Sequence, residues 1–182
     1  MNSALGLVEY LKVPTGMIAA DKMVKTSDIK IIHAATVCPG KYIVLFKGSL
    51  SAVKSALEVG VKNFENTVVD SFLLGNPTEK IYSAITGSCE ININGAIGIV
   101  ESYSVASIIE AADIASKTAR VDLIEVRLAR GMCGKSFFII GGELAAVDMA
   151  INNSKNFLYK SGMYLDSAII AKPDKNFIDN LY

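Results

Sequence analysis

Hydrophobic residues in the first half of the chain fall into short runs that predict strands alternating with helices. Four apolar runs rich in β-branched residues are typical of strands: Ala4–Tyr10, Ile29–Val37, Tyr42–Phe46 and Val68–Leu74. Helical spacing appears in Val13–Thr26, where Pro14 stands at a favourable first position, and in a segment that Ser49 can cap and that ends near Asn63. A further short helix is expected after Pro77. The predicted order is therefore strand, helix, strand, strand, helix, strand, helix.

The spacing of the apolar residues supports both long helices. In the first helix the apolar residues at this spacing are Val13, Met17, Ala20, Met23 and Val24. In the second helix Leu50, Val53, Leu57 and Val61 lie on one face.

The second half of the chain repeats this pattern because the sequence is duplicated. The letters ALGLVE at 4–9 return as AIGIVE at 96–101, a shift of 92 residues. Between 4–38 and 96–130, 11 of 35 residue pairs are identical, which is far more than unrelated segments would share. The two halves are therefore copies of one ancestral domain.

The shift between the copies grows along the chain, which locates two insertions in the second copy. Beyond Cys38 the shift is 94 residues, and near the end it is 96, so that Pro77 pairs with Pro173. We expect two domains, at 1–90 and 91–182, joined by a polar linker near residues 87–95. Strands and helices that alternate around an internal hairpin predict that each domain is α+β, a sandwich of ferredoxin-like type.

Composition narrows the class of protein. Of 182 residues, 51% are hydrophobic and 20% are charged, which suits a compact protein with a large core. Because 18 Lys and Arg balance 18 Asp and Glu, we expect no binding to nucleic acid or to a membrane, and a tendency to self-associate. No apolar run is long enough to span a bilayer, and no signal peptide is recognisable. We expect a cytoplasmic protein whose three cysteines are free thiols or metal ligands.

Several sequence features together resemble the bacterial microcompartment shell proteins. They are the opening ALGLVEY, the helix end AADKMVKTSDI, the passage GKYIVLFKGSLSAVKSALEVG and the duplication itself. The resemblance implies two tandem microcompartment shell domains in the unpermuted order, because the ALGLVE strand comes first in each repeat. It also implies a homotrimer, a pseudohexamer that imitates the hexagonal tiles of single-domain members. The expected partners are then neighbouring hexagonal shell proteins, and the expected location is a bacterial microcompartment in the cytoplasm.

The turn ATVCPGKY, which contains Cys38, is similar to that of the PduT type, in which the cysteine holds an iron–sulfur cluster at the trimer axis. A Cys-Pro-Gly turn is exposed, and one chain has no second cysteine at a ligand spacing. Three copies of Cys38 on a three-fold axis would bring three thiols together, and a zinc ion or an iron–sulfur cluster would neutralise their thiolates. The resemblance favours a 4Fe-4S cluster shared by three chains. It implies electron transfer across the shell or cluster delivery, with an encapsulated redox enzyme as a partner.

Two simpler alternatives remain open for Cys38 and for the tile. A lone cysteine is often a small buried residue, and the tile would then be a cluster-free pore that passes small metabolites. Cys89, in the expected linker, is interpreted as a free thiol.

The second turn offers further candidates around the same axis. Cys133 either contributes a second set of thiols or is a small side chain in a glycine-rich loop. Lys41 and Lys135 either form a basic ring at a pore or project into solvent. The predicted pore-loop residues are Pro39, Gly40, Lys41, Gly131, Met132, Gly134 and Lys135.

Lys25 and Lys117 occupy matching positions near helix ends, where a positive charge is favourable. The resemblance implies that a lysine at this position lies at the assembly edge of the tile.

Catalysis is not expected, so the chain is predicted not to be an enzyme. The letters ARGMCGKS at 129–136 imitate a phosphate-binding loop, but a strand rather than a helix is predicted after them. His33 is the only histidine and lies in an apolar strand, and neither Asp70-Ser71 nor Asp166-Ser167 has a histidine partner for acyl transfer.

Overall fold

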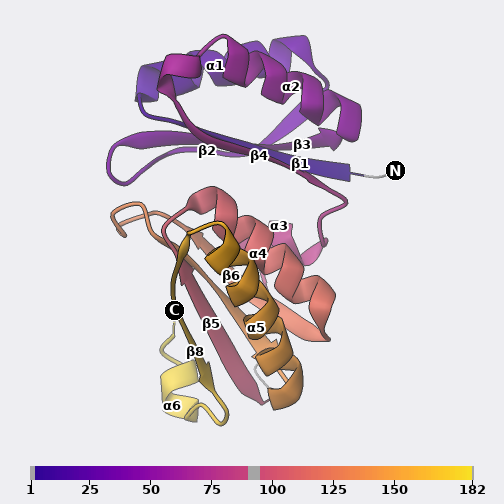
Figure 1. The fold of residues 1–182 in the computed structure, drawn as a ribbon, viewed down its shortest axis with the longest axis vertical. Coiled ribbons are helices and arrows are strands. Elements are labelled where there is room, and N and C mark those ends of the chain that lie inside the picture. Colours follow the sequence, from indigo (N-terminus) through magenta and orange to yellow (C-terminus); the bar gives the residue numbers. More distant parts are fainter. Residues whose placement is uncertain (1–2, 90–94, 182) are drawn as a thin grey trace. The chain divides into compact units, whose positions relative to one another are not determined.

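The computed structural model describes residues 3–89 and 95–181, so the expected linker at 87–95 lies partly outside the described residues. The chain divides into two compact units, 1–77 and 78–182. Each unit contains a four-stranded antiparallel sheet with two long helices on one face (Figure 1). This arrangement confirms the predicted α+β fold of ferredoxin-like type.

The first unit follows the predicted order of elements. They are β1 (Ser3–Tyr10), α1 (Val13–Thr26), β2 (Ile29–Val37), β3 (Lys41–Ser49), α2 (Leu50–Lys62), a short 3-10 helix (Glu65–Thr67) and β4 (Val68–Gly75). The sheet has the order β2-β3-β1-β4, so the two helical crossovers each skip one strand. Ser49 caps α2 as predicted, because its hydroxyl oxygen accepts a hydrogen bond from the backbone N–H of Ala52.

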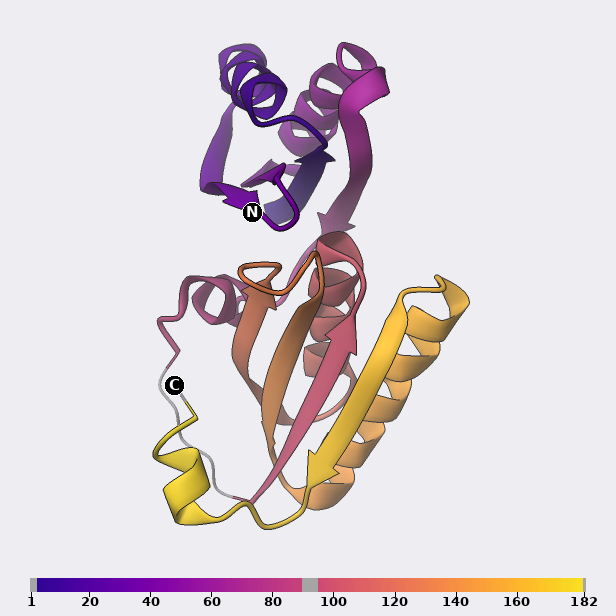
Figure 2. The ribbon, with the colours of Figure 1, turned by 90° about the vertical axis from the view of Figure 1, so that its left-hand side faces the viewer.

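The second unit repeats this arrangement and carries two additional short helices. Its elements are α3 (Lys80–Thr86), β5 (Ala96–Ser102), α4 (Val105–Thr118), β6 (Val121–Leu128), β7 (Ser136–Gly142), α5 (Leu144–Lys160), β8 (Tyr164–Ile170) and α6 (Lys175–Ile178). The sheet order is β6-β7-β5-β8. The helix α3 lies beside the edge strand β6 (Figure 2), so the segment that follows β4 in the sequence packs with the second unit.

The strand registers match between the units at the shifts found in the sequence. Leu5 pairs with Leu74 in the first sheet, and the equivalent Ile97 pairs with Ile170 in the second. The pairing of β2 with β3 contains an irregularity between Ile31 and His33. The pairing of β6 with β7 contains one at the equivalent place, between Leu123 and Glu125. Because the irregularities recur, the duplication extends to the local geometry of each sheet.

Some of the apolar residues at helical spacing in the first unit are not buried. Met17 and Val24 of α1 and Leu50 of α2 are exposed. The buried faces consist instead of small residues with one or two larger ones: Gly16, Ala19, Ala20 and Met23 in α1, and Val53, Ala56 and Gly60 in α2. Small residues face the core because the helices approach it closely. A Cβ atom on Gly60 would lie 2.6 Å from the sulfur of Met23.

The two units fill one equivalent core position in opposite ways. In the first unit the ring of Tyr42 packs so close to α1 that a Cβ atom on Gly16 would lie 2.5 Å from it. The equivalent residues of the second unit are Ser136 and Ile108, and both are fully buried. The large residue has thus moved from the strand to the helix, which preserves core volume.

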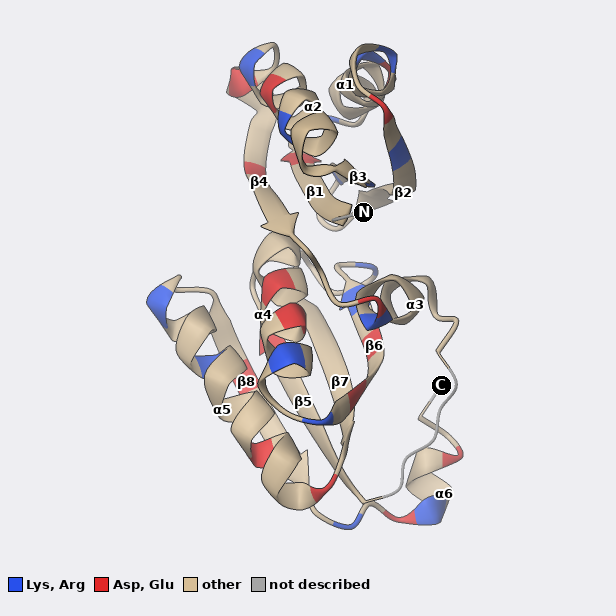
Figure 3. Ribbon diagram, turned by 90° about the vertical axis from the view of Figure 1, so that its right-hand side faces the viewer, with Lys and Arg blue, Asp and Glu red and all other residues tan. Residues whose placement is uncertain are grey.

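Charged residues of both signs are interspersed along the elements of each unit (Figure 3). Within the described part of the chain, no helix combines the length and the apolar character that crossing a bilayer requires.

Candidate functional site

The first candidate turn connects β2 to β3 and carries Cys38. The backbone N–H of Gly40 donates to the carbonyl of Val37 at 2.9 Å, and the Cys38–Pro39 peptide bond is cis, as in a type VI turn. Gly40 has a φ of +95° with open space where a Cβ would stand. The Cys38 side chain is half-buried, while Pro39 and Gly40 are exposed. Cys38 is therefore available at the end of the sheet and is not enclosed in the core.

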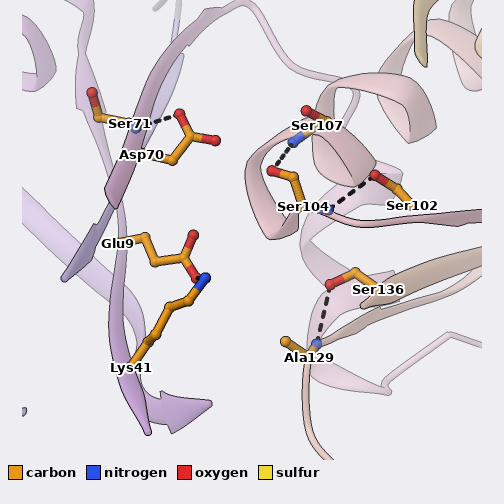
Figure 4. Close-up of polar contacts among 9 residues, drawn as sticks. All are labelled: Glu9, Lys41, Asp70, Ser71, Ser102, Ser104, Ser107, Ala129 and Ser136. Atoms are coloured by element: carbon orange, nitrogen blue, oxygen red, sulfur yellow. Dashed lines mark hydrogen bonds and ion pairs between the residues drawn. The ribbon is translucent and has the colours of Figure 1, made fainter. Parts of the chain in front are cut away.

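An ion pair anchors the chain immediately after this turn. The ammonium of Lys41, the first residue of β3, lies 3.0 Å from a carboxylate oxygen of Glu9 in β1 (Figure 4). Glu9 is only 3% exposed. Asp70 of β4 stands directly opposite Glu9 in the sheet register, and one of its carboxylate oxygens accepts a hydrogen bond from the N–H of Ser71. The charge of Lys41 is therefore matched by a buried carboxylate.

The same ion pair recurs in the second unit. Lys135 binds Glu101 at 2.8 Å, and Asp166 stands opposite Glu101. The pKa of Lys135 is raised above its ordinary value of 10.5 because its ammonium donates a hydrogen bond to Glu101 and is attracted by its charge. In both units the lysine binds a carboxylate of the first strand, and its place at a pore stays a prediction.

The second candidate turn is longer and is held by serine side chains. The hydroxyl oxygen of the fully buried Ser136 accepts a hydrogen bond from the N–H of Ala129 at 3.1 Å (Figure 4). Within the turn, the N–H of Lys135 donates to the carbonyl of Met132, and Cys133 is exposed with a φ of +52°. Gly131 and Gly134 also have positive φ. Strand β7 begins at Ser136, which confirms that this segment is not a phosphate-binding loop.

Sequence reasoning missed Glu9 and Glu101. The available signal was their recurrence at the 92-residue shift inside otherwise apolar strands. A charge in such a place needs a partner, and the glycine-lysine pair retained in both turns supplies it.

Cys89 is held within the second unit. Its thiol lies 3.3 Å from the carbonyl oxygen of Leu123 and 3.3 Å from the hydroxyl of Ser83, and its single S–H can donate to either oxygen. All three cysteines are free thiols. In the part of the chain that the structure describes, no three side chains of His, Cys, Asp or Glu are grouped to hold a metal ion. A thiolate-bound metal at either turn would therefore need ligands from further chains.

The two predicted edge lysines form matching ion pairs. Lys25 binds Asp21 at 2.6 Å, and Lys117 binds Asp113 at 2.6 Å, each one helical turn away. Asp113 is buried and also accepts a hydrogen bond from the N–H of Thr78 at 2.7 Å. The role of these lysines at an edge between tiles stays a prediction.

Comparison with known proteins gives one consistent family. The BMC domain matches residues 4–77 and 96–173. The bacterial microcompartment shell protein PduT of Citrobacter freundii is 31% identical over 176 residues, which cover 97% of this chain and 96% of PduT. The carboxysome assembly protein CcmO of Synechococcus elongatus is 26% identical, and the match covers 98% of this chain and 68% of CcmO.

Solved structures agree with these relatives. A microcompartment protein from Desulfitobacterium hafniense DCB superposes with a TM-score of 0.92 and 36% identity over 97% of this chain and 98% of that one. A fused permuted hexameric shell protein from the RMM microcompartment reaches a TM-score of 0.62 at 15% identity, covering 87% of this chain and 82% of that one, and supports the fold alone.

Proposed function

Because this chain belongs to the BMC-domain family and is a bacterial microcompartment shell protein, we propose that three copies form a pseudohexagonal tile whose centre binds an iron–sulfur cluster through Cys38. The structural role in the shell follows from the family. The trimer and the cluster are the proposal, and electron transfer across the shell is the function that they would serve.

Exposed apolar residues on the first repeat support assembly into a ring. Met17 and Ile18 of α1 are 52% and 55% exposed, whereas Ile109, which is equivalent to Met17, is fully buried in α4. Apolar patches on a surface mark interaction sites. Since the equivalent face of the second repeat is buried, we expect the face of α1 to be covered by another copy. Three chains with two repeats each would close such a ring with six domains.

The observation that carries the cluster proposal is the position of Cys38, half-exposed at a turn that is fixed on both sides. The bond from Gly40 to Val37 closes the turn, and the Lys41–Glu9 ion pair anchors its exit. Thiolates are the usual protein ligands of iron–sulfur clusters, and one chain supplies a single such group at this turn. The donor set therefore fits a metal group shared by three chains.

The paired state of Lys41 strengthens this reasoning. Three neighbouring thiolates repel one another unless a positive charge lies close to them. The ammonium of Lys41 is already bound to Glu9, so it is not free to neutralise the thiolates. A bound metal group would supply that positive charge at Cys38. A 4Fe-4S cluster would supply one-electron transfer at this position.

Anaerobic purification of the protein and of three cysteine variants tests the proposal. We expect a brown protein whose visible absorbance is bleached by reductant, with about four iron atoms per three chains, the content of one 4Fe-4S cluster. Cys38→Ser should abolish both the iron and the colour, while Cys89→Ser, the matched control, should retain them. If Cys133→Ser also loses iron, the second turn contributes ligands. A colourless wild-type protein without iron, or one that contains only zinc, overturns the cluster and leaves a cluster-free pore tile for small metabolites.

A further inference from the structure

The segment that follows the first repeat is bound to a well-defined surface of the second unit. The N–H of Thr78 donates to Asp113, and the ammonium of Lys80 binds the carbonyl of Val121 at 3.0 Å and the carboxylate of Asp122 at 2.7 Å. Helix α3 thereby lies along β6 (Figures 2 and 3), and its Ile81 is fully buried. This segment fastens the chain to the repeat that comes next.

The equivalent segment after the second repeat is not covered in the same way. At the 96-residue shift, Pro173 corresponds to Pro77, Asp174 to Thr78 and Phe177 to Ile81. Helix α6 has no buried residue, and Phe177 is 43% exposed. The duplication thus preserves an apolar residue at the anchor position without the surface that buries it.

The surface that would bury Phe177 exists on the first repeat and is open. Asp21 is equivalent to Asp113 and keeps the pairing with a lysine, but its side chain is 57% exposed against 4% for Asp113. Strand β2 is equivalent to β6 and is likewise less buried. In β6 the side chains of Leu123, Ile124 and Val126 are buried, whereas the equivalent Ile31 and Ile32 are half-buried and Ala34 is exposed.

Charged residues also lie on both partners at this surface, with the signs exchanged but not at equivalent positions. In the second unit the lysine is on the segment and the acid is on the strand, as Lys80 and Asp122. In the first unit the strand carries Lys30 at the position of Asp122, while the C-terminal segment carries Asn176 at the position of Lys80 and Asp179 three residues further on.

We infer that the C-terminal segment of one copy, from Pro173 to Asp179, docks on α1 and β2 of the first repeat of a second copy. The N–H of Asp174 donates to Asp21 there, and Phe177 occupies the place that Ile81 has in the second unit. This inference rests on the proposed tile, in which the segment after each repeat binds the next repeat around the ring. The segment after the first repeat binds the second repeat of the same chain, and the segment after the second repeat binds the first repeat of the neighbouring chain. We call this contact between neighbouring copies, made by residues 173–179, the clasp.

Hydrogen exchange of the full chain, measured by mass spectrometry beside its sedimentation, tests the clasp. In the trimer we expect the amides of residues 174–180 to exchange as slowly as those of α3. Asp21→Ala and Phe177→Ser should each speed the exchange of residues 174–180, for Phe177→Ser by roughly ten- to hundredfold, the factor that corresponds to exposing one buried aromatic side chain. Met149→Ser removes another exposed apolar side chain, on α5, and should leave the segment protected. Unchanged exchange in β1 and in β5, strands inside the two sheets, shows that both units of each variant are folded.

The outcomes separate the clasp from the tile. A trimer whose wild-type residues 174–180 exchange as fast as an unstructured peptide overturns the clasp and leaves the tile intact. A wild-type chain that sediments as a monomer overturns both. Protection of residues 174–180 that persists in a diluted monomer places the segment on its own chain and also overturns the clasp.

Discussion

Replacing Lys41 by methionine should destabilise the protein far more than the same replacement of Lys135. Both lysines bind a carboxylate of the first strand, at 3.0 and 2.8 Å, but the burial differs. The side chains of Lys41 and Glu9 are 22% and 4% exposed, against 40% and 26% for Lys135 and Glu101. Removing one partner of a buried pair costs about 3 kcal/mol because a charge is left unpaired. A more exposed pair contributes much less, because water screens its charges.

Urea unfolding at one fixed protein concentration, followed by far-UV circular dichroism, measures the difference. We expect Lys41→Met to lower the free energy of unfolding by about 3 kcal/mol, and Lys135→Met to lower it much less. The double variant Glu9→Gln/Lys41→Met should recover a large part of the loss, because no unpaired charge then remains. Equal losses for the two lysine variants, or no recovery in the double variant, would refute the claim that Glu9 is a buried charge held by Lys41.

Three further predictions concern the cores and the second turn. Tyr10→Phe should cost about 1 kcal/mol of unfolding free energy by removing a buried hydrogen bond to a carbonyl of α2. Burial raises the pKa of Tyr10 above its ordinary value of 10.0, so an ultraviolet titration of the native protein should show one tyrosine that stays protonated above that pH and is absent in Tyr10→Phe. Gly16→Ile should abolish the native fold of the first unit in circular dichroism and hydrogen exchange, and adding Tyr42→Ser should restore it by copying the core of the second unit. In an NMR titration the pKa of Lys135 should lie above 10.5 and should fall in Glu101→Gln. Because folding raises this pKa, the ion pair with Glu101 stabilises the protein below pH 10.5, and this stabilisation is lost as the pH rises through the pKa of the folded state.

The fold could be predicted almost entirely from the sequence, because local signals and the duplication agreed. Pro14 marked the first turn of α1, Ser49 marked the cap of α2, and both elements begin where these residues indicate. The buried helix faces were harder to predict. Hydrophobicity alone favoured Met17 and Leu50. Gly16 lies close to Tyr42 of β3, and Gly60 lies close to Met23, so small residues occupy the buried faces of both helices.

The candidate site could be predicted only in part. The Cys-Pro-Gly turn was recognisable because turn chemistry is local. The pairing of Lys41 with Glu9 was not predicted, since it joins residues 32 positions apart through the register of β1 and β3. For the same reason no local pattern indicated that Thr78 binds Asp113. Contacts of this kind appear only when the strands are assembled.

Native mass spectrometry of the anaerobically purified protein tests the central claim most directly, because it counts chains and clusters in one particle. We predict a particle of three chains whose mass exceeds that of the polypeptides by one 4Fe-4S cluster, and a particle of three chains without the added mass for Cys38→Ser. Trimers of wild-type protein at the bare polypeptide mass would contradict the claim that Cys38 holds a shared cluster.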